Sequence, residues 1–437
     1  MSSLWMFPAL IAAILTSFPV AFVMLALALL FGWPVFGPAL QYQLIQKLDD
    51  VASANVLAAV PLFIFMGAMF EASGIALRLF DAIHMWTRRI PGGVGIGTIL
   101  MCVVFAATSG IIGATETVVG LLAIPAMLKY GYNKGLICGT ICSGGSLGTI
   151  IPPSVLAVVI GPVASTSVGD VLIGMIVPGL MLAASYIVYI FVRCWLRPQD
   201  GPRLPPAADE PTLAAKLAVT ARVLVPPIVI IAAVLGSILV GLATPTEAAG
   251  TGAIGCLLLT LAYGRLTLPV LWDSLLRTVR VSAMILTILL AGSMFAAVFV
   301  ASGGLGAINE LLALAKLGPN ATLALILALA FLAGFMLDPL VIILIIVPIA
   351  APIIKGFGFD PVWFCVVFLV VLQTAYLTPP MAPSIFYLRG IAPPEIALRD
   401  MYTGIWPFIG LQVLVTAAIM AFPGTVLWLP ALMQSLR

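Results

Sequence analysis

Long apolar runs follow one another along the whole chain, and short polar segments or clusters of Gly and Pro separate them. A helix that crosses a bilayer needs about 20 mostly apolar residues, because the hydrocarbon core is about 30 Å thick. In the first half this pattern predicts spans near 4–17, 18–33, 54–74 and 170–193. In the second half it predicts spans near 218–241, 244–263, 281–302 and 401–430. The chain is therefore predicted to be an all-α polytopic membrane protein.

Further apolar segments are interrupted by Gly or Pro. Glycine-tipped segments at 94–129 and 320–354 predict re-entrant helical hairpins, and segments at 134–165 and 361–389 predict helices broken by Pro. Pro removes a backbone donor, and Gly permits turns that other residues resist. Amphipathic stretches at 38–50 and 266–279 predict connectors that lie in the membrane interface.

The chain also contains a second copy of its own pattern, which is the signature of an internal repeat. Three features recur 227 positions later (for example 352 minus 125): Pro125, Gly131-Tyr132 and Pro152-Pro153 return as Pro352, Gly358-Phe359 and Pro379-Pro380. Others recur at an offset of 229: Phe70, Ala72-Ser73-Gly74 and Pro178 return as Phe299, Ala301-Ser302-Gly303 and Pro407. We therefore expect two repeats, at 1–196 and 218–437, joined by a linker at 197–217.

The predicted spans and loop charges give a topology. If each hairpin enters and leaves by one face, each half crosses the membrane five times, and the odd number inverts the second half. The linker is rich in Pro and carries Arg197, Arg203 and Lys216, so the positive-inside rule places it in the cytoplasm. The same trace puts 15 of the 19 Lys and Arg on the cytoplasmic side. Both chain ends are then predicted to be periplasmic.

Composition narrows the class of protein. Only 8% of residues are charged and 63% are apolar, whereas about 25% of the residues of a soluble domain are charged. The surface must therefore face lipid, and the basic loop residues do not indicate nucleic-acid binding. The six cysteines stand singly on apolar segments without metal-ligand spacing, so we expect them to pack as small hydrophobes. The one histidine, His84, is predicted to be exposed in a polar loop.

Irregular backbone at membrane depth is tolerated only against protein or a wet cavity. The two hairpin tips and two helix breaks pair up across the repeat, and paired breaks of this kind point to a transporter's binding site. Half-helix N-termini suit anionic groups, and half-helix carbonyls suit Na⁺. A hairpin could also owe its Gly to helix packing alone, in which case it would be an ordinary pair of spans.

Two acidic residues lie near the predicted hairpin tips, where a charge is costly and usually functional. Asp338, at the second tip, is expected either to bind or orient a cation or to cap a helix. Glu116, just past the first tip, is expected to contact a coupling cation or a substrate amine or hydroxyl. Glu71 and Glu247 lie near predicted span ends, where a long side chain reaches water.

Several motifs resemble the large membrane subunit of TRAP transporters, the tripartite ATP-independent periplasmic carriers of the ion-transporter superfamily. They are Val60-Pro61-Leu62-Phe63-Ile64-Phe65-Met66-Gly67, the stretch 105–110, Ile151-Pro152-Pro153-Ser154, Gly241-Leu242-Ala243-Thr244-Pro245-Thr246-Glu247-Ala248-Ala249, Leu377-Thr378-Pro379-Pro380 and Phe386. The likeness spans nearly the whole chain. It departs from the family pattern at Ile111-Ile112, where further small hydroxyl residues are common, and at Glu116, where a small neutral residue is commoner.

The resemblance implies Na⁺-coupled import of a small carboxylate-type solute across the bacterial inner membrane, by elevator movement of a transport domain against a scaffold. It implies two partners, a small membrane subunit and a periplasmic substrate-binding protein, and no organic cofactor. The candidate Na⁺ ligands are Ser109, Gly110, Gly145, Gly148, Gly334, Asp338, Thr374 and Thr378. The candidate substrate contacts are Glu116, Thr149, Pro152, Ser154, Thr378 and Pro380.

Two other classes of protein are consistent with parts of this pattern. A self-sufficient ion-coupled carboxylate carrier has similar hairpins and repeats but needs no binding protein. An intramembrane enzyme would need acid–base equipment, and no HExxH, GxSxG or paired-Asp motif is present. The chain is therefore not expected to be an enzyme. It also lacks a GxxxxGK[ST] phosphate loop, so an ion gradient is the expected source of energy.

Overall fold

The computed structural model describes residues 2–16, 18–110, 113–204 and 212–435, and these residues form helices and loops without strands. The helices of the first half are α1 (Met6–Ile14), α2 (Val20–Phe36), α3 (Leu40–Ala52), α4 (Ala59–Ala72), α5 (Ile75–Thr87), α6 (Gly93–Ser109), α7 (Ala114–Lys129), α8 (Lys134–Ser146), α9 (Val155–Val163) and α10 (Val168–Leu196). Those of the second half are α11 (Leu213–Leu239), α12 (Pro245–Ala262), α13 (Leu268–Ala301), α14 (Gly304–Leu314), α15 (Pro319–Ala333), α16 (Pro339–Gly356), α17 (Pro361–Leu377), α18 (Pro383–Ile391), α19 (Leu398–Ala421) and α20 (Gly424–Ser435). Seven helical segments of the described chain are long and apolar enough to cross a membrane. The prediction of an all-α membrane protein with many spans is therefore confirmed.

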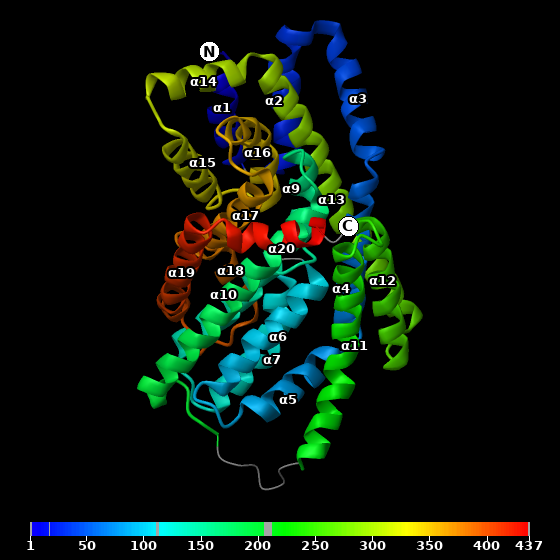
Figure 1. Cartoon of the computed structure of the whole chain (residues 1–437), viewed down its shortest axis with the longest axis vertical. Helices are drawn as coiled ribbons and strands as arrows, with labels where there is room; N and C mark the ends of the chain where they lie inside the picture. Colours follow the sequence, from blue (N-terminus) through cyan, green and yellow to red (C-terminus); the bar gives the residue numbers. More distant parts are fainter. Residues whose placement is uncertain (1, 17, 111–112, 205–211, 436–437) are drawn as a thin grey trace.

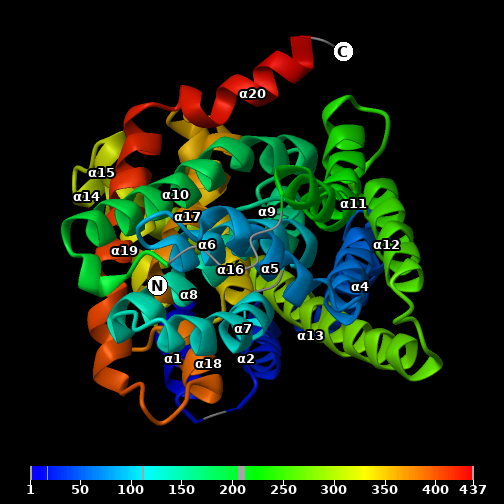
Figure 2. The same ribbon diagram turned by 90° about the horizontal axis from the view of Figure 1, so that it is seen from below.

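Most of the described helices fall into two groups that lie side by side. Helices α4, α11, α12 and α13 gather on one side of the molecule in both views (Figures 1 and 2), and α4 packs directly on α12 and α13. Helices α2 and α3 pack on α13 and complete this arm group. The hairpin group consists of α6–α10 and α15–α19, which pack on one another. Each predicted hairpin and broken helix thus belongs to the hairpin group.

The helix breaks form where the sequence places Pro. Asn133 starts α8 by accepting a hydrogen bond from the Leu136 amide at 3.1 Å. After the short 3₁₀ turn η4 (Leu147–Thr149), residues 150–154 are not helical, and α9 begins at Val155. The second break separates α17 from α18 at 378–382. Both breaks contain a Pro-Pro pair, which removes two donors from the helix ladder and disfavours helical geometry in the residue before it.

The two segments predicted to be hairpins each form a packed helix pair, α6 with α7 and α15 with α16. Figure 1 shows α6 and α7 in the lower half of the molecule and α15 and α16 in the upper half. The first tip begins at Gly110, which ends α6 with a φ of +57° and donates its amide to the Ala106 carbonyl. Only Gly takes such a left-handed C-terminal position at little cost.

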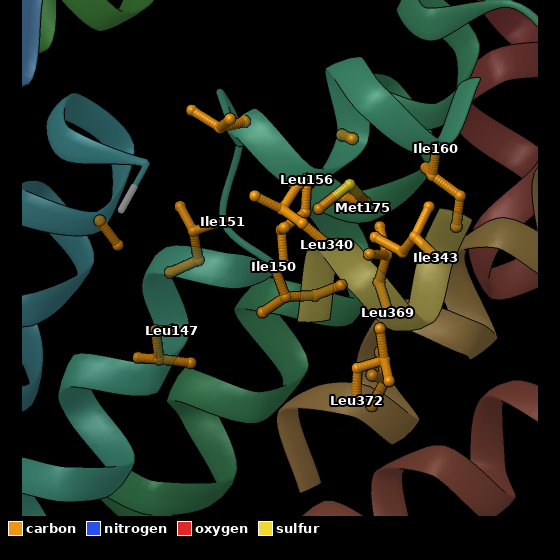
Figure 3. Packing of buried hydrophobic residues seen from close by; sticks show 14 of the residues in the cluster. Leu147, Ile150, Ile151, Leu156, Ile160, Met175, Leu340, Ile343, Leu369 and Leu372 are labelled. Atoms are coloured by element: carbon orange, nitrogen blue, oxygen red, sulfur yellow. The ribbon is translucent and has the colours of Figure 1, made fainter. Parts of the chain in front are cut away.

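Apolar side chains fill the space around the first break (Figure 3). Leu147 and Ile150, next to the break, are fully buried, and Leu340 of α16 and Leu369 of α17 are buried in the same cluster. Helices in a membrane gain little from excluding water, so this contact relies on close packing and many weak dispersion contacts. The break of one half is thereby held against helices of the other half.

Several predicted boundaries were wrong. The predicted span at 4–17 forms only the nine-residue helix α1, which is too short to cross a bilayer. The predicted connector at 266–279 is not separate from the next span, because both form the single 34-residue helix α13. At 1.5 Å per residue this helix is about 51 Å long. The predicted last span, 401–430, ends at Ala421, and a separate helix, α20, follows it.

His84 was also placed wrongly, since it lies in α5 and not in a loop. Its ring is half-buried and stacks between the rings of Phe80 and Tyr130, with centroids at 5.9 and 6.0 Å. Burial, and then the charge of Arg88, lower the pKa of His84 below its usual value. His84 therefore packs as an aromatic residue. The six cysteines are all free and buried, as predicted.

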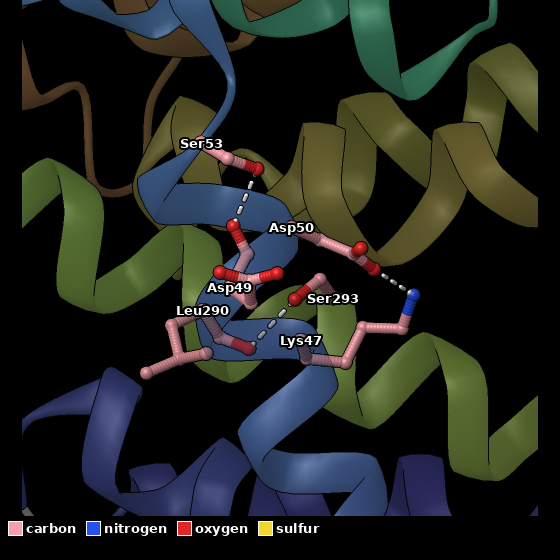
Figure 4. Close-up of polar contacts among 6 residues, drawn as sticks. All are labelled: Lys47, Asp49, Asp50, Ser53, Leu290 and Ser293. Carbon is pink, nitrogen blue, oxygen red and sulfur yellow. Dashed lines mark hydrogen bonds and ion pairs between the residues drawn. The ribbon is translucent and has the colours of Figure 1, made fainter.

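Helix α3 has the polar face that its sequence predicts (Figure 4). Lys47 forms an ion pair with Asp50 at 2.8 Å, and the Ser53 hydroxyl donates to the Asp49 carbonyl at 2.7 Å. On the facing helix α13, the Ser293 hydroxyl donates to the Leu290 carbonyl at 2.9 Å. Each of these contacts closes within its own helix. They therefore stabilise α3 and α13 separately and do not tie one to the other.

Candidate functional site

The first hairpin tip packs against the first helix break. A Cβ atom at Gly110 would lie 2.9 Å from the Pro153 carbonyl oxygen, so the two backbones nearly touch. In the break, the Ser154 hydroxyl donates to the Thr149 carbonyl at 2.9 Å, and the Thr149 hydroxyl donates to the Ser146 carbonyl at 2.8 Å. Ser154 and Thr149 are almost fully buried. The structure thus brings together one set of predicted residues from the hairpin and the break.

Glu116 lies in the first turn of α7 and is fully buried against α8. A Cβ atom at Gly145 would overlap the Glu116 side chain, so the absence of a side chain at Gly145 makes room for it. Neither Glu116 carboxyl oxygen has a hydrogen-bond partner in the described part of the chain. The polar groups that face it are Cys102, Cys142 and the hydroxyls of Tyr376 and Tyr387. A carboxyl group with only neutral neighbours needs a cation, a ligand group or a proton to be stable there.

The second hairpin tip packs against α17 in a similar way. A Cβ atom at Gly334 would lie 2.5 Å from the Cβ of Ala375. One residue earlier on α17, the Thr374 hydroxyl donates to the Val370 carbonyl at 2.9 Å, and the Thr378 hydroxyl donates to the Thr374 carbonyl at 2.6 Å. Each hydroxyl keeps lone pairs that can accept from a ligand or contact a cation.

Asp338 caps α16 at the second tip. Its carboxylate accepts a hydrogen bond from the Leu340 amide at 2.8 Å, and its side chain is exposed. The two roles predicted for this residue are compatible, because the cap uses only the Oδ1 oxygen of the carboxylate. The two acidic residues predicted near span ends have structural partners: Glu71 pairs with Arg277 at 2.6 Å, and Glu247 forms a capping box with Thr244.

The predicted cation ligands thus divide into two groups by their packing. The first cation group consists of Ser109, Gly110, Gly145 and Gly148, at the first tip and break. The second cation group consists of Gly334, Asp338, Thr374 and Thr378, at the second tip and break. The side chain of Ser109 and the tip residues 111–112 lie outside the described residues. Pro152 is buried in its break, whereas Pro380 is exposed and its carbonyl accepts from the Tyr402 hydroxyl at 3.3 Å.

Four polar residues of the site were missed by sequence reasoning: Gln373, Tyr376, Ser384 and Tyr387. The Tyr387 ring lies over Gly113 at the first tip, where a Cβ would come within 2.7 Å of it. The Tyr376 and Ser384 hydroxyls are buried and lack a hydrogen-bond partner among the described residues. Gln373 donates to Ser146 at 3.0 Å across 227 positions, and the repeat offset could have identified this pair.

Chemically, the site offers main-chain carbonyls, hydroxyls and two carboxyl groups around two helix breaks. Oxygen donors of this kind suit hard cations, and half-helix N-termini suit anionic groups.

Comparison with known proteins gives the family. Residues 7–425 match the family described as tripartite ATP-independent periplasmic transporter, DctM component. The C4-dicarboxylate TRAP transporter large permease protein DctM of Pseudomonas aeruginosa is 31% identical over 358 residues, which cover 82% of each chain. The ectoine/5-hydroxyectoine TRAP transporter large permease protein UehC of Ruegeria pomeroyi is 30% identical over 431 residues, which cover 97% of each chain.

A solved structure shows the same fold at low sequence identity. The crystal structure of the Alcanivorax borkumensis YdaH transporter matches with a TM-score of 0.65 and 15% identity, and the match covers 93% of this chain and 98% of that chain. The sequence matches confirm the resemblance that the motifs indicated, and the matched proteins are transporter permeases, not enzymes. This chain therefore belongs to the TRAP transporter family, as a DctM component or large permease.

Proposed function

We propose that this chain imports a small carboxylate-type solute across the bacterial inner membrane, driven by a Na⁺ gradient. The observation that carries this proposal is the packing of each hairpin tip against a helix break, Gly110 on Pro153 and Gly334 on Ala375. Each of these places combines backbone that is free of the helix ladder with buried hydroxyls. Paired helix breaks near the centre of a membrane protein are typical of ion-coupled carriers. The carboxylate of the substrate would bind at the breaks near Thr149, Ser154 and Thr378.

We propose that the two halves are inverted repeats related by a pseudo-twofold axis. The helices of the two halves follow in the same order. Several contacts between a helix of one half and a helix of the other recur when each helix is replaced by its counterpart. Helix α8 packs on α19 and its counterpart α17 packs on α10, while α7 packs on α18 and α16 packs on α9. The opposite placement of the two hairpins in Figure 1 supports the inversion.

The proposed orientation places the linker in the cytoplasm and both chain ends in the periplasm. In Figure 1, α1 lies toward one end of the long axis and the start of α11, which follows the linker, lies at the other, whereas α20 lies near the middle. Two contacts anchor the described part of the linker: the Arg193 side chain pairs with Asp200 at 2.9 Å, and the Leu204 amide donates to the backbone carbonyl of Arg88 at 3.2 Å. Basic residues at this end agree with the positive-inside rule.

The arm group would be the scaffold of an elevator, and the hairpin group would be its moving transport domain. A crevice of about 690 Å³ opens between α3 and α13 on one side and α9 and α16 on the other, and Lys47, Ser293, Pro162 and Leu344 are among the residues that line it. Helices α13 and α16 still touch beside it, where Gly292 faces Leu344, so the boundary is open only in part. A partly open boundary agrees with relative motion of the two groups. The scaffold would also contact the partner subunit, and α11 offers it a face of apolar side chains such as Leu217 and Val229, which otherwise meet lipid.

Two partners are proposed, since the family is tripartite. One is a small membrane subunit that braces the scaffold. The other is a periplasmic binding protein that delivers the substrate.

The function is tested by uptake of candidate carboxylates into liposomes that contain this chain and its small membrane subunit. An inward Na⁺ gradient is compared with K⁺, each with and without the periplasmic binding protein encoded nearby. We expect uptake only when both Na⁺ and the binding protein are present. Uptake driven by Na⁺ without the binding protein would indicate a self-sufficient carrier, and equal uptake in K⁺ would contradict Na⁺ coupling.

Asp338→Asn separates the two roles of Asp338. Asn caps helices as well as Asp does, so the Asp338→Asn variant should keep the melting temperature of the wild type. Loss of the charge should raise the half-saturating Na⁺ concentration about tenfold, which corresponds to about 1.4 kcal/mol. The measurement is the Na⁺ dependence of uptake at saturating substrate.

Asp360→Asn is the matched control. Asp360 caps α17 by accepting from the amides of Val362 and Trp363 at 2.8 and 3.0 Å, and it is exposed. It belongs to neither cation group, so its replacement should leave the Na⁺ dependence unchanged. Identical Na⁺ curves for the Asp338 and Asp360 variants would exclude Asp338 from cation binding.

A further inference from the structure

Two residues at equivalent positions of the two halves are joined by a buried hydrogen bond. The Gln373 amide nitrogen donates to the Ser146 hydroxyl oxygen at 3.0 Å, and the two residues are 227 positions apart. That separation is the repeat offset of the Pro-Pro pairs at the two breaks. Gln373 is 1% exposed and Ser146 is fully buried. A residue that contacts its own counterpart lies on the axis that relates the two copies.

On the Ser146 side, hydrogen bonds continue from this contact through the first break. The Ser146 hydroxyl donates to the Ser143 carbonyl at 2.8 Å, so its oxygen is oriented to accept from Gln373. The Ser146 carbonyl accepts from Thr149, whose own carbonyl accepts from Ser154. Ser146 also lies between Gly145 and Gly148 of the first cation group. A shift of the α8 end is therefore transmitted to Gln373.

On the other side, Gln373 is the neighbour of Thr374 in the second cation group. Residues 373–377 are the last residues of α17, so a movement of this helix end moves the amide and the Thr374 hydroxyl together. The Gln373 amide oxygen has no hydrogen-bond partner among the described residues. A buried amide that leaves one polar atom unpaired costs stability compared with an apolar residue of similar size. Packing alone therefore does not account for a glutamine at this position.

We propose that the Gln373–Ser146 hydrogen bond couples the two cation groups, so that occupancy of one favours occupancy of the other. Gln373 acts as a positioning residue: it contacts neither the cation nor the substrate but holds the end of α17 in register with the end of α8. The proposal rests on the proposed function, because it requires two sites that bind Na⁺. Coupling between sites is a free energy and is reciprocal.

The test is the Na⁺ titration of the purified complex, followed by its thermal stabilisation and, separately, by uptake. The wild type should titrate cooperatively, with a Hill coefficient that approaches about 2 for two coupled sites. Gln373→Met keeps the length of the side chain and removes the hydrogen bond. It should lower the Hill coefficient to about 1 while the melting temperature without Na⁺ is kept or raised. A purely structural role would change the melting temperature and leave the cooperativity intact.

Gln412→Met is the matched control, because Gln412 is a fully buried glutamine of α19 that belongs to neither cation group. It should keep the cooperative titration.

A second variant, Ser146→Gln combined with Gln373→Ser, exchanges the two partners across the axis. Because the positions are equivalent, the hydrogen bond can form again and should restore the cooperativity that Gln373→Met loses.

Each outcome has a definite meaning. A cooperative titration of Gln373→Met overturns the proposed link and leaves Na⁺ coupling in place. A wild type that does not respond to Na⁺ overturns both the proposed function and the link. If the exchange variant titrates like Gln373→Met, the hydrogen bond is not what couples the sites.

Discussion

Gly145→Ala is expected to reduce stability and uptake more than any other change of one methyl group among the residues of the first cation group. A Cβ atom at position 145 would overlap the Glu116 side chain, which is fully buried. Gly→Ala in a helix interior normally stabilises by about 0.5–1 kcal/mol. Here overpacking of about 1–3 kcal/mol should outweigh that gain and displace α7 from α8. We expect uptake to fall by about tenfold or more, since 1.4 kcal/mol corresponds to a factor of ten.

The measurements are the melting temperature in detergent and the rate of uptake in liposomes. Gly390→Ala is the control, because Gly390 lies on α18 in the same group of helices and a Cβ there meets nothing within 4 Å. A double variant, Glu116→Ala with Gly145→Ala, removes the overlap and should regain the lost melting temperature. Uptake by the double variant then reports separately on the Glu116 carboxyl. A Gly145→Ala variant as stable and active as the wild type would contradict the close approach of α7 and α8.

Local sequence signals predicted the breaks and hairpins because their causes are local. Pro152-Pro153 and Pro379-Pro380 lack the backbone donors that a continuing helix needs, whatever the surroundings. Gly110 ends α6 because it alone adopts the required backbone angle at little cost. Features of this kind can be read from one segment of sequence.

The wrongly predicted helix boundaries also have local causes in the sequence. The amphipathic pattern of 266–279 suggested an interfacial connector separate from the next span. Between Val270 and Ala291, however, the chain has neither Gly nor Pro, so nothing stops the helix and α13 runs through. At the last span the reverse occurred: Pro423-Gly424 interrupts an apolar run that hydropathy alone reads as continuous.

The surroundings of the candidate site could not be predicted in this way, because they come from distant parts of the chain. Glu116 meets Gly145 from the next helix and Tyr376 from the other half. Neither neighbour has a signal near Glu116 in the sequence. Only the repeat offset carries long-range information, and it relates positions such as Ser146 and Gln373 that lie close to the axis.

Gly404→Ala is expected to destabilise the hairpin group strongly, although Gly404 belongs to no predicted site. Gly135 and Gly139 of α8 let this helix approach α19 so closely that the backbones touch at Gly404. A Cβ at Gly404 would overlap the Gly135 carbonyl, and a Cβ at Gly139 would overlap the Gly404 carbonyl. Small residues four positions apart commonly bring membrane helices together in this way. Because a backbone carbonyl cannot change rotamer, α19 must move, at a cost of about 1–3 kcal/mol.

Gly410→Ala on the same helix tests this argument, since a Cβ at Gly410 meets nothing within 4 Å. Its melting temperature should equal or exceed that of the wild type, whereas that of Gly404→Ala should fall by several degrees. Equal melting temperatures for the two variants would show that α8 and α19 do not approach so closely. The position of α8 also sets where its end at Ser146 meets Gln373. Gly404→Ala should therefore reduce the cooperativity of Na⁺ binding as well, through a residue that contacts neither cation group.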